Sequence, residues 1–109
     1  MKYLVIGPDG NVINGYGNLD EAALQTLVGG PFEVLPSPDG IAATVLASAE
    51  AKQRGEPANH PATRLIRSRL KVNDFVAGIV VVTGPNSSDG SLTDIDAPTI
   101  EAVVNQIAP

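Results

Sequence analysis

Short apolar runs separated by turn residues predict two β-hairpins in the first half of the chain. The strands of the first hairpin are Lys2–Ile6 and Val12–Tyr16, and those of the second are residues 32–35 and 41–46. Both connections contain Pro-Asp-Gly, in which Pro presets φ, Asp supports the turn and Gly accepts a positive φ. We therefore expect both pairs of strands to be antiparallel.

A fifth strand is predicted for residues 74–83, which contain the longest apolar run of the chain. A nearly continuous apolar sequence is typical of a strand that is covered on both faces, so we expect it at the centre of the sheet. At an edge, the same strand would offer unpaired backbone groups to other chains. Residues 47–58 predict a loop or an irregular helical turn, and residues 84–93 predict a flexible loop.

Apolar residues at helical spacing predict a first and a last helix. Asn18 and Glu21 fit a capping box at the start of the first helix, which we expect to end at Gly29-Gly30. Asp96 fits the N-cap of the last helix. The apolar stripe of that helix consists of Ile100, Val103, Val104 and Ile107.

A middle helix is predicted to begin at Pro61, because Pro is favoured in the first turn of a helix. Asn59 or His60 lies where its N-cap is expected. Arg69 would fall on the apolar face of a longer helix. The helix should therefore end near Ser68, or Arg69 should be paired or extend its charge to solvent.

Together these elements predict a single α+β domain over residues 1–109. Its mixed, mostly antiparallel sheet has about five strands and is joined by about three helices, in the order β-β-α-β-β-α-β-α. A chain of 109 residues can bury one core without disulfide or metal support.

Composition and charge exclude several classes of protein. The chain has no Cys, which excludes disulfides and thiolate metal sites. Its first apolar run is shorter than that of a secretory signal and no run could span a bilayer, so we expect a cytoplasmic protein without a membrane partner. The net charge of −5 argues against binding to nucleic acid.

The basic residues are concentrated in one segment. Six of the 7 Lys and Arg residues lie in the segment from Lys52 to Lys71. Of the 12 acidic residues in the chain, only Glu56 lies in this segment. A basic helix face can simply be solvated, or it can select an acidic partner by complementary charge. The sequence leaves both readings open.

No catalytic motif is recognisable in the sequence. His60 is the single His, and a lone His beside a helix start is more often structural than catalytic. Neither a Gly-x-Ser-x-Gly elbow nor a phosphate-binding loop is present. Asp89, Asp94 and Asp96 lack the spacing of a calcium loop. We therefore expect a non-enzymatic protein with no cofactor and no metal.

One constellation of residues could bind an anion. Asn59, His60, Thr63, Arg64 and Arg67 surround the start of the middle helix, where unpaired N–H groups and the helix dipole favour negative charge. Arg can add a bidentate contact to phosphate or carboxylate. Alternatively, Asn59 or Thr63 caps the helix while the Arg residues pair with acids of the protein itself.

Several segments resemble a family of small proteins. Residues 24–34, Leu-Gln-Thr-Leu-Val-Gly-Gly-Pro-Phe-Glu-Val, are followed by an Asn-x-x-Ala-Thr segment at residues 59–63 and by Asp74 and Gly78 before the last strand. In this order and spacing they resemble DUF3846, an uncharacterised family common in bacteriophages and actinobacteria. Members often carry Asn-Glu-Glu-Gly-Lys before the Asn-x-x-Ala-Thr segment, and residues 48–52 keep only part of it.

The resemblance implies a phage or mobile-element protein of unknown function and supplies no catalytic residues. Our leading hypothesis is an accessory protein that binds a host macromolecule, for example a host protein, through a charged face. The alternative is a protein that binds a nucleotide-like or other small anionic ligand in a pocket near Pro61. A homodimer would use a surface other than the strand at residues 74–83.

Overall fold

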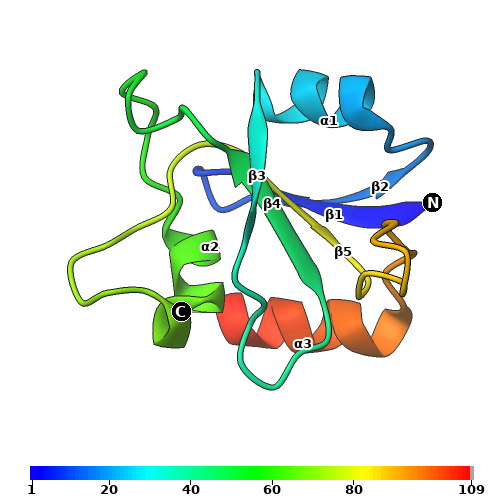
Figure 1. The fold of residues 1–109 in the computed structure, drawn as a ribbon. Coiled ribbons are helices and arrows are strands. Elements are labelled where there is room, and N and C mark those ends of the chain that lie inside the picture. Colours follow the sequence, from blue (N-terminus) through cyan, green and yellow to red (C-terminus); the bar gives the residue numbers. More distant parts are fainter. Residues whose placement is uncertain (109) are drawn as a thin grey trace.

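The computed structural model describes residues 1–108, and it confirms the predicted α+β fold and the order of its elements. A five-stranded sheet carries helices on both faces (Figure 1). The elements are β1 (Lys2–Ile6), β2 (Val12–Tyr16), α1 (Glu21–Val28), β3 (Phe32–Leu35), β4 (Thr44–Ser48), α2 (His60–Leu65), the 3-10 helix η1 (Arg67–Arg69), β5 (Val80–Thr83) and α3 (Ala97–Ile107).

The sheet has the strand order β2-β1-β5-β4-β3, and all four pairings are antiparallel. β5 lies at the centre and every one of its residues is buried, which confirms its predicted position. The predicted extent of this strand, residues 74–83, was wrong because only Val80–Thr83 joins the ladder. Gly78 adopts a φ of 77°, which interrupts the extended backbone before β5.

β4 begins and ends later than the sequence pattern predicts. Ile41 donates its N–H to the carbonyl of Pro38, and Ala43 donates to that of Ile41, so this stretch forms local bonds instead of pairing with β3. The ladder between β3 and β4 runs from Leu35 opposite Val45 to Phe32 opposite Ser48. The predicted strand at residues 41–46 is therefore corrected to Thr44–Ser48.

The two faces of the sheet have different covers. α1 lies over one face, while α2 and α3 lie over the other (Figure 1). Because side chains alternate along a strand, Val80 and Val82 face α2 and α3, whereas Val81 faces α1. The core on the α2 and α3 face is the larger, and its members include Leu4, Ile6, Val45, Leu65, Ile66, Val76, Ile95, Val103 and Ile107.

The helix ends follow local sequence signals with two corrections. Asp20, rather than Asn18, caps α1, because its Oδ1 accepts a hydrogen bond of 2.8 Å from the N–H of Ala23. α2 ends at Leu65 rather than near Ser68, and the chain continues as η1. The caps predicted at Gly29 for α1 and Asp96 for α3 are confirmed, and of the two candidates for α2 the cap is Asn59 rather than His60. Among residues 1–108, no helix has the length and apolar character needed to cross a bilayer.

Candidate functional site: the surface around residues 59 to 78

The side chain of Asn59 is completely buried and uses its polar atoms inside the protein. Its Oδ1 accepts a 3.0 Å hydrogen bond from the N–H of Ala62, which caps α2. Its Nδ2 donates to the carbonyl oxygens of Ile6 at 2.9 Å and Gly78 at 2.8 Å. The backbone N–H of Asn59 donates to Val76. Asn59 therefore ties the start of α2 to the end of β1 and to the segment that precedes β5.

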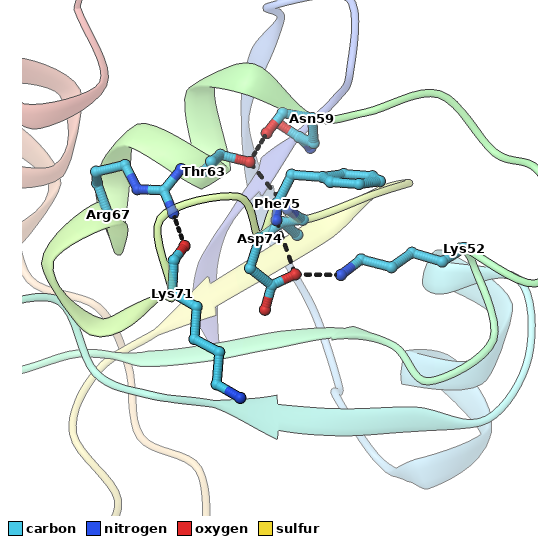
Figure 2. Close-up of polar contacts among 8 residues, drawn as sticks. Lys52, Asn59, Thr63, Arg67, Lys71, Asp74 and Phe75 are labelled. Carbon is cyan, nitrogen blue, oxygen red and sulfur yellow. Dashed lines mark hydrogen bonds and ion pairs between the residues drawn. The ribbon is translucent and has the colours of Figure 1, made fainter.

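Thr63 supports the same segment from the next turn of the helix. Its hydroxyl donates to the carbonyl of Asn59 at 2.8 Å and accepts from the N–H of Val76 at 2.9 Å (Figure 2). The residue is buried, so these bonds satisfy groups that water does not reach. In the described residues, every buried side-chain nitrogen and oxygen has a hydrogen-bond partner.

Asp74, Lys52 and Phe75 form a polar clamp at the surface. The Lys52 ammonium lies 2.5 Å from Asp74 Oδ1 and 4.6 Å from the centroid of the Phe75 ring (Figure 2). The N–H of Phe75 also donates to Asp74 Oδ1, at 2.8 Å. The hydrogen bond from Lys52 and then that from the N–H of Phe75 lower the pKa of Asp74, with a smaller electrostatic contribution from Arg67. Asp74 is thus held as a carboxylate and is poorly suited to act as a general base near neutral pH.

A small cavity of about 130 Å³ adjoins this clamp. Its lining includes Lys52, Asp74 and Phe75 together with Glu33 and Ser48 from the neighbouring strands. Pockets that bury nucleotide-sized ligands generally have volumes of about 300–1,000 Å³. This cavity is therefore too small to enclose such a ligand. The outer surface of the clamp is better suited to contact a binding partner.

The six basic residues between Lys52 and Lys71 divide into two groups. Three of them pair with carboxylates: Lys52 with Asp74, Arg54 with Glu56, and Arg69 with Asp39.

The other three are Arg64, Arg67 and Lys71. Arg64 Nε donates to the carbonyl of Ile107 at 2.9 Å, and an Arg67 guanidinium N–H donates to the carbonyl of Lys71 (Figure 2). Within residues 1–108, none of these three forms a salt bridge. Arg67 and Lys71 are exposed, so their positive charges can reach an acidic partner.

The structure does not bring the five predicted anion-site residues together as a pocket. Asn59 caps α2, as the alternative reading of the sequence expected, and Thr63 uses its hydroxyl internally without capping the helix. Within residues 1–108, Arg64 and Arg67 bond to backbone carbonyls and not, as that reading also expected, to acidic side chains. His60 and Arg67 are exposed, and Arg64 is half-buried against the end of α3. The cavity beside the clamp is lined by other residues, and so is a hollow beside β2. The anion site stays a prediction, and its ligand would have to bind through His60, Arg64 and Arg67.

Two exposed apolar side chains, one of them part of the clamp, were not predicted from the sequence. Val72 is 89% exposed and Phe75 is 42% exposed, in the segment that connects η1 to β5. Phe75 was assigned to a buried strand because it begins the apolar run. The Asn73-Asp74 pair was the available signal, since both residue types favour turns. We define the 67–75 surface as Arg67, Lys71, Val72, Phe75 and the adjoining Lys52.

The segments that carry the family resemblance meet in this region. Arg54 donates to Ser48 at 3.0 Å and to Glu56 at 2.6 Å. A Cβ on Gly30 would lie 3.0 Å from the Arg54 guanidinium, and one on Gly78 would lie 2.9 Å from a carboxylate oxygen of Glu56. The two glycines therefore leave room for the ion pair between the end of α1 and the entry to β5. Gly30, the Arg54–Glu56 pair and Gly78 are distant along the chain and thus pack together in this region.

Fold and site together define a small α+β domain with an internally braced, partly cationic surface. The chain belongs to the family described as domain of unknown function DUF3846, whose sequence model matches residues 1–108. This match confirms the resemblance found in the sequence. Comparisons with curated proteins and with solved structures gave no match.

Proposed function

We propose that this protein is a non-enzymatic binding module that recognises an acidic surface of a partner protein through the 67–75 surface. The observation that carries the proposal is the exposure of Val72, at 89%, beside the cations of Arg67 and Lys71. In the phage or mobile-element setting that the family resemblance implies, the expected partner is a protein of the host.

The chemistry of this surface fits a protein interface. Binding energy at such interfaces is concentrated in a few central side chains, among which Trp, Tyr and Arg are enriched. Val72 and Phe75 would supply apolar contact, while Arg67 and Lys71 would pair with carboxylates at the rim. Burial of apolar area contributes about 25 cal/mol per Å² before the costs of association.

The backbone behind the surface is fixed before any partner binds. Asn59 and Thr63 hold Val76 and Gly78, and Asp74 bonds to the N–H of Phe75. Ordering a loop on binding costs free energy, so a braced loop retains more of its contact energy as affinity. This bracing supports recognition by a preformed surface.

The test uses the full chain as bait in a lysate of the host cells. The affinity of the captured protein for the chain is then measured. Val72→Ser and the double variant Arg67→Gln/Lys71→Gln should each weaken binding at least about tenfold, a change of about 1.4 kcal/mol. Val34→Ser is the control, because Val34 is also an exposed Val but lies on β3, outside the 67–75 surface.

Affinity should also fall as salt concentration rises, because exposed charge pairs are screened. The proposal is overturned if the captured protein binds the 67–75 variants as tightly as it binds the Val34 control. Absence of any captured protein, or capture of a nuclease-sensitive species alone, would overturn it as well.

A further inference from the structure

The sheet has two edge strands, β2 and β3, and their protection is unequal. β3 is only four residues long, lies between Pro31 and Pro36, and carries the exposed carboxylate of Glu33. Short length, Pro and charge are the features by which proteins prevent another strand from pairing with an edge. β2, with the sequence Val-Ile-Asn-Gly-Tyr, has neither Pro nor charge.

The free edge of β2 presents backbone groups in a definite pattern. Gly7 donates to the carbonyl of Asn11, and Gly17 donates to that of Met1, each at 2.9 Å. An antiparallel ladder alternates between hydrogen-bonded and non-hydrogen-bonded pairs, so these two bonds determine which residue pairs of β1 and β2 are hydrogen-bonded. With the register of β1 and β2, the N–H and C=O groups of Val12, Asn14 and Tyr16 point away from β1.

We infer that β2 pairs with β2 of a second copy of this chain, antiparallel about a twofold axis at Asn14. In this register Val12 lies opposite Tyr16 of the other copy, and Asn14 lies opposite its own equivalent. All three outward-facing residues of each copy then exchange backbone hydrogen bonds. The interface is isologous, as in most symmetric dimers.

The side chains on both faces of β2 fit this arrangement. On the α3 face, a hollow of about 360 Å³ is lined by residues that include Asn14, Tyr16 and Ile100. Tyr16 is 79% exposed and would pack on Val12 of the second copy. Aromatic and β-branched side chains are favourable partners in directly opposed pairs.

On the α1 face, the ring of Tyr3 occupies the space above Gly15. Ile13 lies opposite Gly15 of the second copy in the inferred register, so it would contact that copy's Tyr3 ring. Ile13 is 58% exposed in the single chain, and this contact would bury apolar surface.

The charge distribution of the chain leaves β2 open to a second copy. The net charge is −5, so two copies repel each other over most of their surface. Because β2 carries no charge, it is a segment where two copies can approach without a direct like-charge contact. The 67–75 surface borders a cavity that is lined by residues of β3 and β4 and by none of β2. This inference therefore does not depend on the proposed function.

The test is the mass of the full chain in solution, measured by light scattering and sedimentation from micromolar to millimolar concentration. The expected mass is twice the 11.2 kDa of one chain. Ile13→Lys places one positive charge from each copy in the interface, and the repulsion between these like charges should yield monomers. Asn14→Pro removes an outward N–H, a position where an edge strand tolerates Pro, and should also yield monomers. Val34→Lys, on the other edge strand, should remain dimeric.

Circular dichroism establishes that each variant is folded. Should Asn14→Pro fail to fold, Ile13→Lys decides, because its side chain is exposed in the single chain. A monomeric wild type at millimolar concentration overturns the inference, and so does a folded Ile13→Lys variant that remains dimeric.

Discussion

Two regions rich in polar residues differ in how their side chains are used. In residues 59–78, Asn59 and Thr63 bond to backbone groups that are distant in sequence, and both side chains are buried. In the exposed loop at residues 84–93, Ser87 and Ser91 both donate to Asp89, two positions away. The first region connects separate elements of the fold, whereas in the second these bonds close a local turn.

The difference lies in solvent access rather than in the number of hydrogen bonds. A buried group that loses its partner keeps its desolvation cost, whereas an exposed group recovers a bond with water. Variants of the first region should therefore lower the free energy of unfolding strongly, and variants of the second should hardly change it. The four predictions below test this contrast, from the largest expected effect to the smallest.

Asn59→Ala should have the largest effect. It removes the cap on Ala62 and leaves the carbonyls of Ile6 and Gly78 without their side-chain donor. Loss of the cap and of buried partners should lower the free energy of unfolding by about 3 kcal/mol or more, measured by urea denaturation. Asn59→Asp retains the capping oxygen but replaces both donors with a buried carboxylate oxygen that faces two carbonyl oxygens, so it should also be strongly destabilising. A loss below about 1 kcal/mol for either variant would contradict the assigned role.

Thr63→Val should have an intermediate effect, because it preserves side-chain shape and removes only the hydroxyl. The N–H of Val76 then has no partner, which should cost about 1–2 kcal/mol. Hydrogen exchange should show a selective loss of protection at Val76. Thr26→Val is the control, since that hydroxyl donates to Ala22 in an exposed position of α1. Equal losses for the two variants would remove the distinction between buried and exposed bonds.

Asp74→Asn tests the clamp through its pH dependence. The pKa of Asp74 is lowered in the folded state, so ionisation of this group stabilises the protein above the ordinary value of 3.8. That contribution is lost as pH falls through the folded-state pKa. The difference in Tm between wild type and variant should be largest near neutral pH and shrink below pH 3.8. A difference that does not vary with pH would show that the ionised clamp adds no stability.

Ser87→Ala should have the smallest effect. The hydroxyl that it removes donates to Asp89 in the exposed loop, where water can replace it. The free energy of unfolding should stay within about 0.5 kcal/mol of wild type, as measured by thermal and urea denaturation. A loss as large as that of Thr63→Val would mean that this loop is coupled to the core.

Most elements of the fold were predictable because their signals are local. The turn at Pro8-Asp9-Gly10, the left-handed cap at Gly29 and the cap at Asp96 each depend on neighbouring residues, and all three are found as predicted. The central position of β5 also followed from the sequence, since a nearly continuous apolar run is typical of a strand that is covered on both faces.

The candidate site was predicted only in part. The sequence left two readings of Asn59 and Thr63 open, a ligand site and a helix cap, and neither reading included a bond to a distant segment. Asn59 instead binds Ile6, 53 positions away, and no spacing rule links two such residues. The exposure of Phe75 was missed because apolar residues in a run are ordinarily buried, whereas Val72 stands outside that run, between Lys71 and Asn73.

The sequence by itself determined the class of fold, the order of the elements and most helix caps, because turn chemistry and apolar periodicity act over a few residues. Tertiary structure decided where β4 begins, how short β5 is and which polar groups are buried. These features depend on which distant segments come into contact. A hydrogen bond between Asn59 and Gly78 exists only after the sheet has brought their segments together.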